Sequence, residues 1–198
     1  MKKSVKIILS VSAALAISLV YSASSFAGTC NKIRNDVFRL HILANSDSRE
    51  DQNLKISVRD SILRSTKERL SLGSKEQAER WAVDNLGYIK EIAKEEISRQ
   101  GFDYPVTVSV EDSYFSTRQY DDLTLPAGVY RSLRVEIGKG EGHNWWCVLF
   151  PQLCIPSSVD REEILESLSD DELEIIENGE KYKIGFWLLD LLSGKGRG

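Results

Sequence analysis

The sequence is poor in residues that fibrous proteins and polyanion-binding proteins need. Its 198 residues include only four Pro and 13 Gly, which excludes a collagenous or Pro-rich low-complexity chain. Basic residues are not in excess, since 26 Lys and Arg stand against 30 Asp and Glu. Because phosphate neutralisation requires clustered Lys and Arg, we expect no nucleic acid partner. The length suits one domain, or two small ones, with a buried core.

Histidine is scarcer still, with only His41 and His143 in the chain. The sequence contains no Gly-x-Ser-x-Gly elbow, no His-Glu-x-x-His pair and no phosphate-binding loop. One hydrolytic arrangement stays open, with His41 and Asp47 as an acid–base pair and Ser46 as nucleophile. A strand-end histidine beside a helix cap explains the same residues more simply. We therefore expect no enzymatic activity and no cofactor.

Acidic residues are absent from residues 1–27, where three lysines precede a largely apolar run from Ile7 to Val20. Ser25-Phe26-Ala27 resembles a small-x-small cleavage pattern. This order predicts a secretory signal peptide over residues 1–27. An uncleaved N-terminal membrane anchor is the alternative, since the run to Ala27 is nearly long enough to span a bilayer. Both interpretations place the rest of the chain outside the cytoplasm.

Export permits disulfides, and the chain has three cysteines. Cys147 and Cys154 are the natural pair, because Phe150-Pro151 between them can turn the chain and set them opposite each other. In the chain-entropy model this closure stabilises the fold by about 2.5 kcal/mol. Two buried free thiols are the alternative. A zinc site that adds His143 is disfavoured because its ligands lack paired short spacings, so we expect no metal.

Hydrophobic periodicity predicts an α+β fold. Residues 37–44 alternate as a strand with Phe38, Leu40 and Ile42 facing inward, and turn chemistry follows at residues 45–48. Two helix starts are predicted by the spacing of an N-cap residue and the third helical residue, which is shared by Asp47 with Glu50, or Ser48 with Asp51, and by Ser74 with Gln77. Later residues predict two long helices and further strands, the last of them apolar on both faces like a central strand. The loop from Gly138 to Gly142 is typical of a β-hairpin. The predicted elements are helices from Ser48 to about Leu72 and from Ser74 to Gly101, and strands at Val106–Val110, Ser116–Tyr120, Val129–Ile137 and Asn144–Phe150.

The C-terminal part differs in composition. The segment Ser157–Asn178 is strongly acidic with one basic residue, which indicates a helix flanked by a solvated linker. Tyr182–Leu192 has apolar residues at helical spacing but is too short to span a bilayer, so it docks on the domain, on a membrane or on a partner. We therefore expect an α+β domain at residues 28–156, with a mixed, largely antiparallel sheet packed by two long helices. An acidic linker and an amphipathic helix follow at residues 157–198.

Two segments carry more polar and aromatic side chains than a scaffold requires. One is the junction between the first strand and the first helix, and the other begins the last strand, where two tryptophans are adjacent. Neighbours along a strand face opposite sides, so one Trp can fill the core while the other contacts a partner; coverage of both is the alternative. The predicted partner-binding residues are His41, Asn45, Ser46, Asp47, Asp51, Gln52, Arg59, His143, Asn144, Trp145 and Trp146.

The stretches Arg39–Asp60 (RLHILANSDSREDQNLKISVRD) and Tyr130–Cys154 (YRSLRVEIGKGEGHNWWCVLFPQLC) resemble the stage II sporulation protein R family of endospore-forming bacteria. The resemblance covers most of residues 33–155, and Gln152 stands where the family usually has a second Pro. It implies an exported signalling protein, made in the forespore and secreted into the space between the forespore and mother-cell membranes.

The resemblance also implies a partner. This partner is a membrane-embedded aspartic protease, contacted on its extracytoplasmic face, which then processes the pro-form of the mother-cell sigma factor sigma E. A peripheral membrane contact by the final helix is a further option. Two alternatives remain from the residues alone. One is an exported hydrolase of cell wall or peptide that uses His41, Asp47 and Ser46, and the other is an exported domain that only tethers through its last helix.

Overall fold

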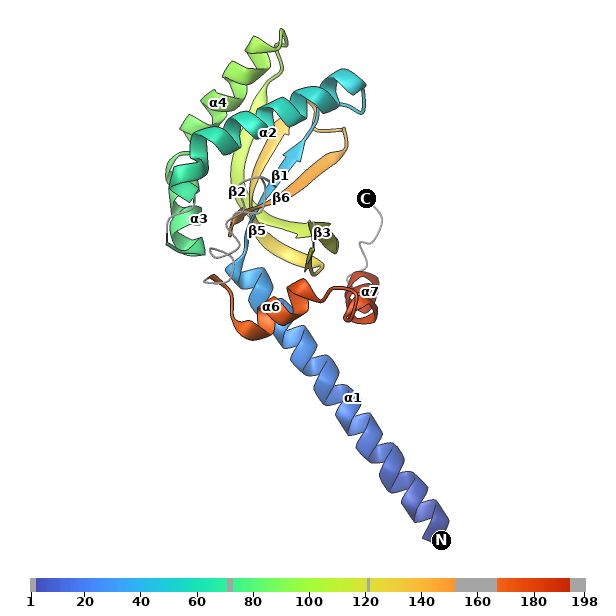
Figure 1. The fold of residues 1–198 in the computed structure, drawn as a ribbon. Coiled ribbons are helices and arrows are strands. Elements are labelled where there is room, and N and C mark those ends of the chain that lie inside the picture. Colours follow the sequence, from blue (N-terminus) through green and yellow to red (C-terminus); the bar gives the residue numbers. More distant parts are fainter. Residues whose placement is uncertain (1–2, 71–72, 121, 152–166, 193–198) are drawn as a thin grey trace.

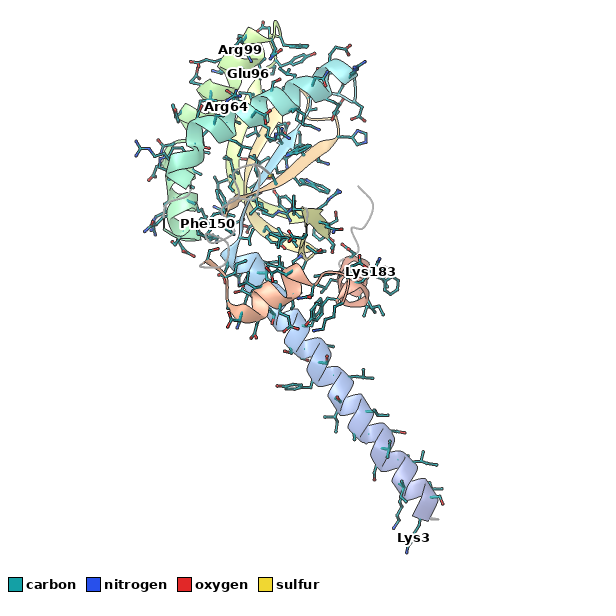
Figure 2. The ribbon with its side chains drawn as sticks, viewed as in Figure 1. Lys3, Arg64, Glu96, Arg99, Phe150 and Lys183 are labelled. Atoms are coloured by element: carbon teal, nitrogen blue, oxygen red, sulfur yellow. The ribbon has the colours of Figure 1, made fainter. Side chains whose placement is uncertain are left out.

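The structure is a computed structural model that describes residues 3–70, 73–120, 122–151 and 167–192 (Figure 1). The first element is α1, Lys3–Asp36, which by length and composition is able to cross a membrane. Side chains near Lys3 stand clear of the rest of the protein, as Figure 2 shows, whereas Cys30 and Ile33 are buried. The helix continues without a break past Ala27, the predicted end of the signal peptide. Cleavage there stays a prediction.

A four-stranded sheet forms the centre of the domain and confirms the α+β fold class. Its strands are β1 (Phe38–Leu43), β2 (Val106–Phe115), β5 (Gly128–Ile137) and β6 (Asn144–Phe150), in the order β2-β5-β1-β6. β1 is parallel to β5, and the other two pairs are antiparallel, so the sheet is mixed and largely antiparallel. The prediction that β6 is a central strand is wrong, because β6 lies at one end of this strand order and pairs only with β1 in it.

β1 is buried on both faces, whereas the sequence predicted one inward face. Phe38, Leu40 and Ile42 face a core formed with α2 (Arg49–Leu70), α3 (Lys75–Asp84) and α4 (Leu86–Arg99). The other face meets a second core, to which the end of α1 and the C-terminal helices contribute. Figure 1 shows α2, α3 and α4 together on one side of the sheet and α1 with α6 at its lower end. The strand is therefore covered by two layers.

The predicted second long helix is two helices, which corrects the expectation of two long helices. Ser74 caps α3, and its side chain accepts from the backbone N–H of Gln77 as predicted. Asn85 caps the end of α3, and its side-chain amide donates to the carbonyl of Trp81 at 2.8 Å. Side-chain bonds of this kind compete with the helical ladder, and α4 begins afresh at the next residue. Gly101, at φ 84°, follows the end of α4.

Smaller elements complete the described fold. β3 (Arg118–Tyr120) and β4 (Leu123–Leu125) pair in a separate two-stranded sheet. α6 (Asp170–Glu177) begins with a capping box between Ser169 and Glu172, and α7 (Lys183–Leu192) confirms the predicted C-terminal helix. The first part of the predicted acidic segment, residues 157–166, lies outside the described residues.

Candidate functional site

The two polar segments meet at the carboxyl end of β1. Residues 138–143 connect β5 to β6, and because β1 lies between these strands, the connection crosses over its end. Gly142 donates its backbone N–H to the carbonyl of Ala44 at 3.0 Å, and Glu141 donates to that of Asn45 at 3.3 Å. The predicted β-hairpin is therefore wrong, since β1 pairs with both strands that the loop joins.

The glycines of this loop permit a close approach between backbones. A Cβ on Gly142 would lie 2.2 Å from the carbonyl oxygen of Ser46, a distance that no side chain tolerates without a backbone shift. Gly138 has φ 61°, in the left-handed region that favours glycine. The glycine spacing thus marks a loop that presses on the β1–α2 turn.

A buried carboxylate organises that turn. Asp51, 4% exposed, accepts from Asn45 Nδ2 at 2.9 Å and from Ser46 Oγ at 2.5 Å. Its own N–H donates to Ser48 Oγ at 3.1 Å, which confirms the predicted Ser48 cap. Burial acts to raise the pKa of Asp51, but hydrogen bonds from Ser46, Asn45, Tyr104 and Ser48 outweigh it and hold the pKa below its ordinary value. Asp51 is therefore ionised at neutral pH.

An exposed pair joins the loop to the turn. Asp47 Oδ1 accepts the backbone N–H of His143 at 2.6 Å and also contacts Nδ1 of its ring. The backbone bond, followed by the ring contact, lowers the pKa of Asp47. Both side chains are largely exposed, so a negative carboxylate and an imidazole stand together at the surface.

Lys55 of α2 fixes the connection between β5 and β6 through its buried side chain. The side chain is 3% exposed, and its Nζ donates to Gln52 Oε1 at 2.6 Å and to the carbonyl of His143 at 2.8 Å. Gln52 in turn donates to the carbonyl of Ser46 at 2.9 Å. Burial lowers the pKa of Lys55. Sequence reasoning missed this residue; the available signal was a lysine next to Leu54 in the apolar stripe of α2.

The six residues Asn45, Ser46, Asp47, Asp51, Gln52 and His143 are called the junction site below. All six were predicted, and the structure brings them together from two segments about 90 residues apart. The buried Asp51 holds Asn45 and Ser46, which precede Asp47, and the buried Lys55 holds the carbonyl of His143. His143 in turn bonds to Asp47. Chemically the arrangement offers a fixed set of polar groups for recognition.

The two tryptophans lie on opposite faces of β6, as predicted. Trp145 packs against the core under α2, with the Arg59 guanidinium 4.3 Å from its ring centroid. Trp146 packs against the second core, with Arg118 at 4.1 Å. Both rings are half-buried beneath arginines. Arg118 was not predicted, because the sequence does not show which element covers this face.

His41 lies away from the junction site, on the face of Trp146. Its Nε2 donates to Oδ1 of Asn144 at 2.7 Å, and burial lowers its pKa. The hydrolytic arrangement is not assembled, because Asp47 bonds to His143 and Ser46 to Asp51.

The described residues form no metal site, and the predicted disulfide extends beyond them. Among residues 3–70, 73–120, 122–151 and 167–192, no group of three or more His, Cys, Asp or Glu could hold a metal ion. Cys147 is buried, and Cys154, its predicted disulfide partner, lies outside the described residues. The disulfide stays a prediction.

Comparisons of the chain with family models and with known proteins agree on the same family. A family model described as stage II sporulation protein R matches residues 34–160, which include the sheet and the junction site. The chain is also similar to Stage II sporulation protein R of Bacillus subtilis (strain 168), with 38% identity over 135 residues. That match covers 68% of this chain and 60% of the relative, less than two thirds of its length. No solved structure matches the chain.

Proposed function

This chain belongs to the stage II sporulation protein R family, and from that premise we propose that it is an exported sporulation signal made in the forespore. It enters the space between the forespore and mother-cell membranes and activates a membrane-embedded aspartic protease from the extracytoplasmic side. The protease then processes the pro-form of the mother-cell sigma factor sigma E. The apolar N-terminal helix, preceded by lysines, is consistent with the export step.

The observation that carries the proposal is the held geometry of the junction site. An activator shifts a protease only by binding its active state more tightly than its inactive state. A surface that is already ordered loses little conformational entropy on binding, so more of the contact energy is available for that difference. Asp47 and His143 are exposed yet fixed by the surrounding hydrogen bonds. They are the groups that we place in contact with the protease.

The tryptophans and arginines extend this surface. Arg59 stacks on Trp145 near the middle of α2, and both side chains are half-buried. Tryptophan and arginine are common anchors in protein interfaces. A hydrolytic role receives no support here, since His41, Ser46 and Asp47 have separate hydrogen-bond partners.

The test uses the full chain, co-expressed with the protease and the sigma pro-form in a cell that does not sporulate. Processing is followed by immunoblot, and export by the amount of chain outside the cytoplasm. Wild-type chain should raise processing, and Asp47→Ala should reduce it about tenfold at equal export, which corresponds to about 1.4 kcal/mol of lost contact. Glu91→Ala, an exposed carboxylate on α4, is the matched control and should process normally.

Two results would contradict this function. Unchanged processing in the presence of exported wild-type chain would remove the activator role itself. Full processing by a folded, exported Asp47→Ala chain would keep the role but remove the junction site from the contact.

A further inference from the structure

The C-terminal helix α7 has a buried side and an uncovered apolar side. Phe186 is buried, and its ring meets Phe26 of α1 edge-on with centroids 5.5 Å apart. Asp190 accepts the backbone N–H of Thr117 at 3.2 Å, which ties the same helix to the start of β3. The outward side consists of four exposed apolar side chains, which are Ile184 (75% exposed), Trp187 (60%), Leu188 (42%) and Leu191 (60%).

The position of this contact along α1 is specific. Phe26 is the twentieth residue counted from Ile7, the first residue after the last lysine of the N-terminus. Twenty helical residues rise about 30 Å, the thickness of the hydrocarbon core of a bilayer. The most apolar window of α1 is uncovered in the structure. A membrane that encloses this stretch therefore ends at the level where α1 meets α7.

The direction of α7 fits the same surface. In Figure 1, α1 lies along the picture while α7 is seen nearly end-on, so the two helix axes cross. A helix that crosses a membrane-spanning helix at the level of its exit runs along the membrane surface. Lysine and glutamate side chains around the turn before α7 are paired, with Lys181 bonded to Glu174 at 2.6 Å and Lys183 to Glu180 at 3.3 Å.

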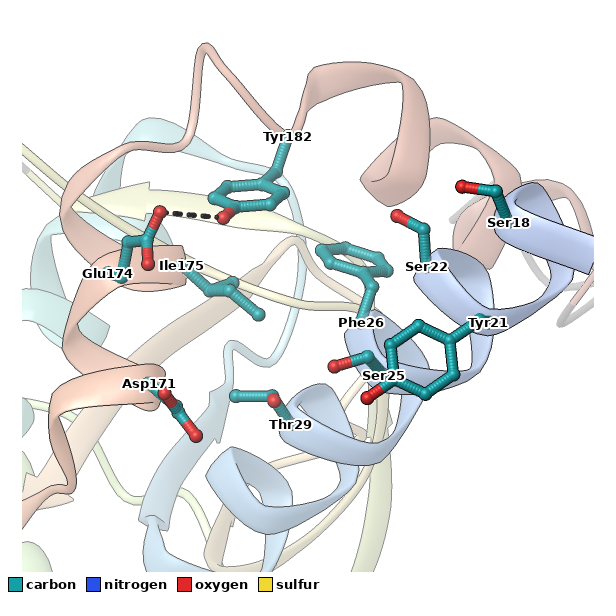
Figure 3. A pocket seen from close by; sticks show the side chains of 10 residues that line it. All are labelled: Ser18, Tyr21, Ser22, Ser25, Phe26, Thr29, Asp171, Glu174, Ile175 and Tyr182. Carbon is teal, nitrogen blue, oxygen red and sulfur yellow. Dashed lines mark hydrogen bonds between the residues drawn. The ribbon is translucent and has the colours of Figure 1, made fainter. Parts of the chain in front are cut away.

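The surface of α1 changes character at this level. A hollow of about 370 Å³ opens between α1 and the C-terminal segment, as Figure 3 shows. Its α1 side carries Ser18, Ser22, Ser25 and Thr29, a polar stripe at helical spacing that begins about two turns before Phe26. Asp171 and Glu174 of α6 also line the hollow. Tyr182 closes the opposite side and stacks on Phe26. Polar and aromatic groups thus gather where the helix leaves an apolar environment, as they do at membrane interfaces.

We propose that α1 is retained as the uncleaved N-terminal membrane anchor, and that α7 lies on the outer surface of the membrane that α1 spans, with its four exposed apolar side chains inserted at the headgroup boundary. Trp187 is then an interfacial anchor, and Phe186 and Asp190 hold the helix to the domain. The contact sets the height of the domain above the bilayer. This inference concerns a segment outside the family match and requires no protease, so it stands apart from the proposed function.

The test places the full chain in nanodiscs of phosphatidylethanolamine and phosphatidylglycerol that include a lipid with a nitroxide near the headgroup. Tryptophan emission is compared with and without the nitroxide. The chain has four tryptophans, and we expect the quenched fraction to fall at least twofold in Trp187→Phe. Trp81→Phe, which removes a ring packed in the helical core, is the matched control and should keep the quenched component.

A second variant changes the apolar face of α7 while it keeps Trp187 as the fluorescent reporter. Ile184→Glu with Leu191→Glu places charges on the exposed face of α7 without touching Phe186. We expect Trp187 to lose nitroxide quenching and to become accessible to aqueous iodide, with unchanged circular dichroism. Val83→Glu, an exposed apolar residue of α3, should change neither signal.

Three results would overturn the proposal. Equal nitroxide quenching in wild type and Trp187→Phe would show that Trp187 does not meet lipid. Full access of wild-type Trp187 to iodide would place α7 in water. Protection of Trp187 from both quenchers would show that protein covers the face, either a second copy of the chain or another partner.

Discussion

At the scale of single residues, the junction site depends on the buried carboxylate of Asp51. Asp51→Ala leaves the Asn45 amide and the Ser46 hydroxyl without their acceptor, and an unsatisfied buried group costs about 1–3 kcal/mol. We therefore expect the free energy of unfolding to fall by about 2 kcal/mol, measured by denaturant titration in detergent. The neighbouring Glu50→Ala removes an exposed side chain and should change it by less than about 0.5 kcal/mol. Equal losses in the two variants would refute the role given to Asp51.

His41 gives the fold a dependence on pH. Burial holds its pKa below the ordinary value of 6.5, so the folded state keeps the ring neutral where the unfolded chain binds a proton. Stability from this group is complete above about pH 6.5 and is lost as the pH falls below it. The melting temperature of wild type should therefore drop between pH 7 and pH 5.

The matched variant is His41→Gln, which keeps an amide donor toward Asn144 but cannot titrate. Its melting temperature should vary less over the same interval. Asp47 and Asp51 have lowered pKa values, so their contribution to stability is lost only below about pH 4 and does not enter this interval. Parallel pH profiles for the two proteins would show that another group titrates.

At the scale of elements, the crossing of the β5–β6 loop over β1 depends on Gly142. Gly142→Ala drives a Cβ against the Ser46 backbone and should destabilise by roughly 1–3 kcal/mol, the usual cost of forced overpacking. Gly87→Ala on α4 is the control, because its Cβ meets nothing within 4 Å and alanine favours helix by up to about 1 kcal/mol. Thermal melts of the two variants should shift in opposite directions. A stable Gly142→Ala chain would contradict the close approach.

Elements with strong local signals could be predicted from the sequence, and those fixed by long-range contacts could not. The apolar stripe of α2 and the Ser48 and Ser74 caps are local, and the structure confirms them. The break at Asn85 was missed because the apolar stripe continues across it and only a side-chain bond ends the helix. Strand order depends on which strands meet, so the position of β6 and the crossing loop were both wrong.

The second buried face of β1 was missed for a chemical reason. Arg39 is fully buried, although arginine normally marks an exposed position. Its guanidinium lies 3.9 Å from the Phe115 ring centroid and 4.8 Å from that of Tyr130, so aromatic faces take the place of a carboxylate. The junction-site residues were predicted because turn and cap chemistry concentrates them. Lys55 and Arg118 were missed because only the fold shows what they cover.

At the scale of the whole molecule, the sheet separates two cores, of which one lies within the residues that match the family and the other extends beyond them. The core under α2, α3 and α4 and the junction site lie within the matched residues 34–160. The second core combines the sheet with α6 and α7, which lie beyond that match. The junction site is at the carboxyl end of β1, whereas the end of α1 precedes its amino end. The chain therefore presents its predicted contact with the protease at the end of β1 opposite to the end where α1 enters.

The net charge of the chain indicates whether α7 would bind the membrane through its apolar face or through electrostatic attraction. All the charge of residues 1–27 comes from three lysines, so residues 28–198 carry 23 basic and 30 acidic residues. An acidic domain is repelled by anionic lipid, so contact of α7 with the membrane must come from burial of its apolar face.

Salt screens electrostatic repulsion over about 8–10 Å near physiological ionic strength and leaves apolar burial intact. Raising salt from 50 to 500 mM in the nanodisc experiment should therefore leave the nitroxide quenching of Trp187 unchanged or slightly stronger. Replacing phosphatidylglycerol by phosphatidylcholine should act in the same direction. A severalfold loss of quenching in high salt would instead indicate that lysines, and not the apolar face of α7, hold the helix to the surface.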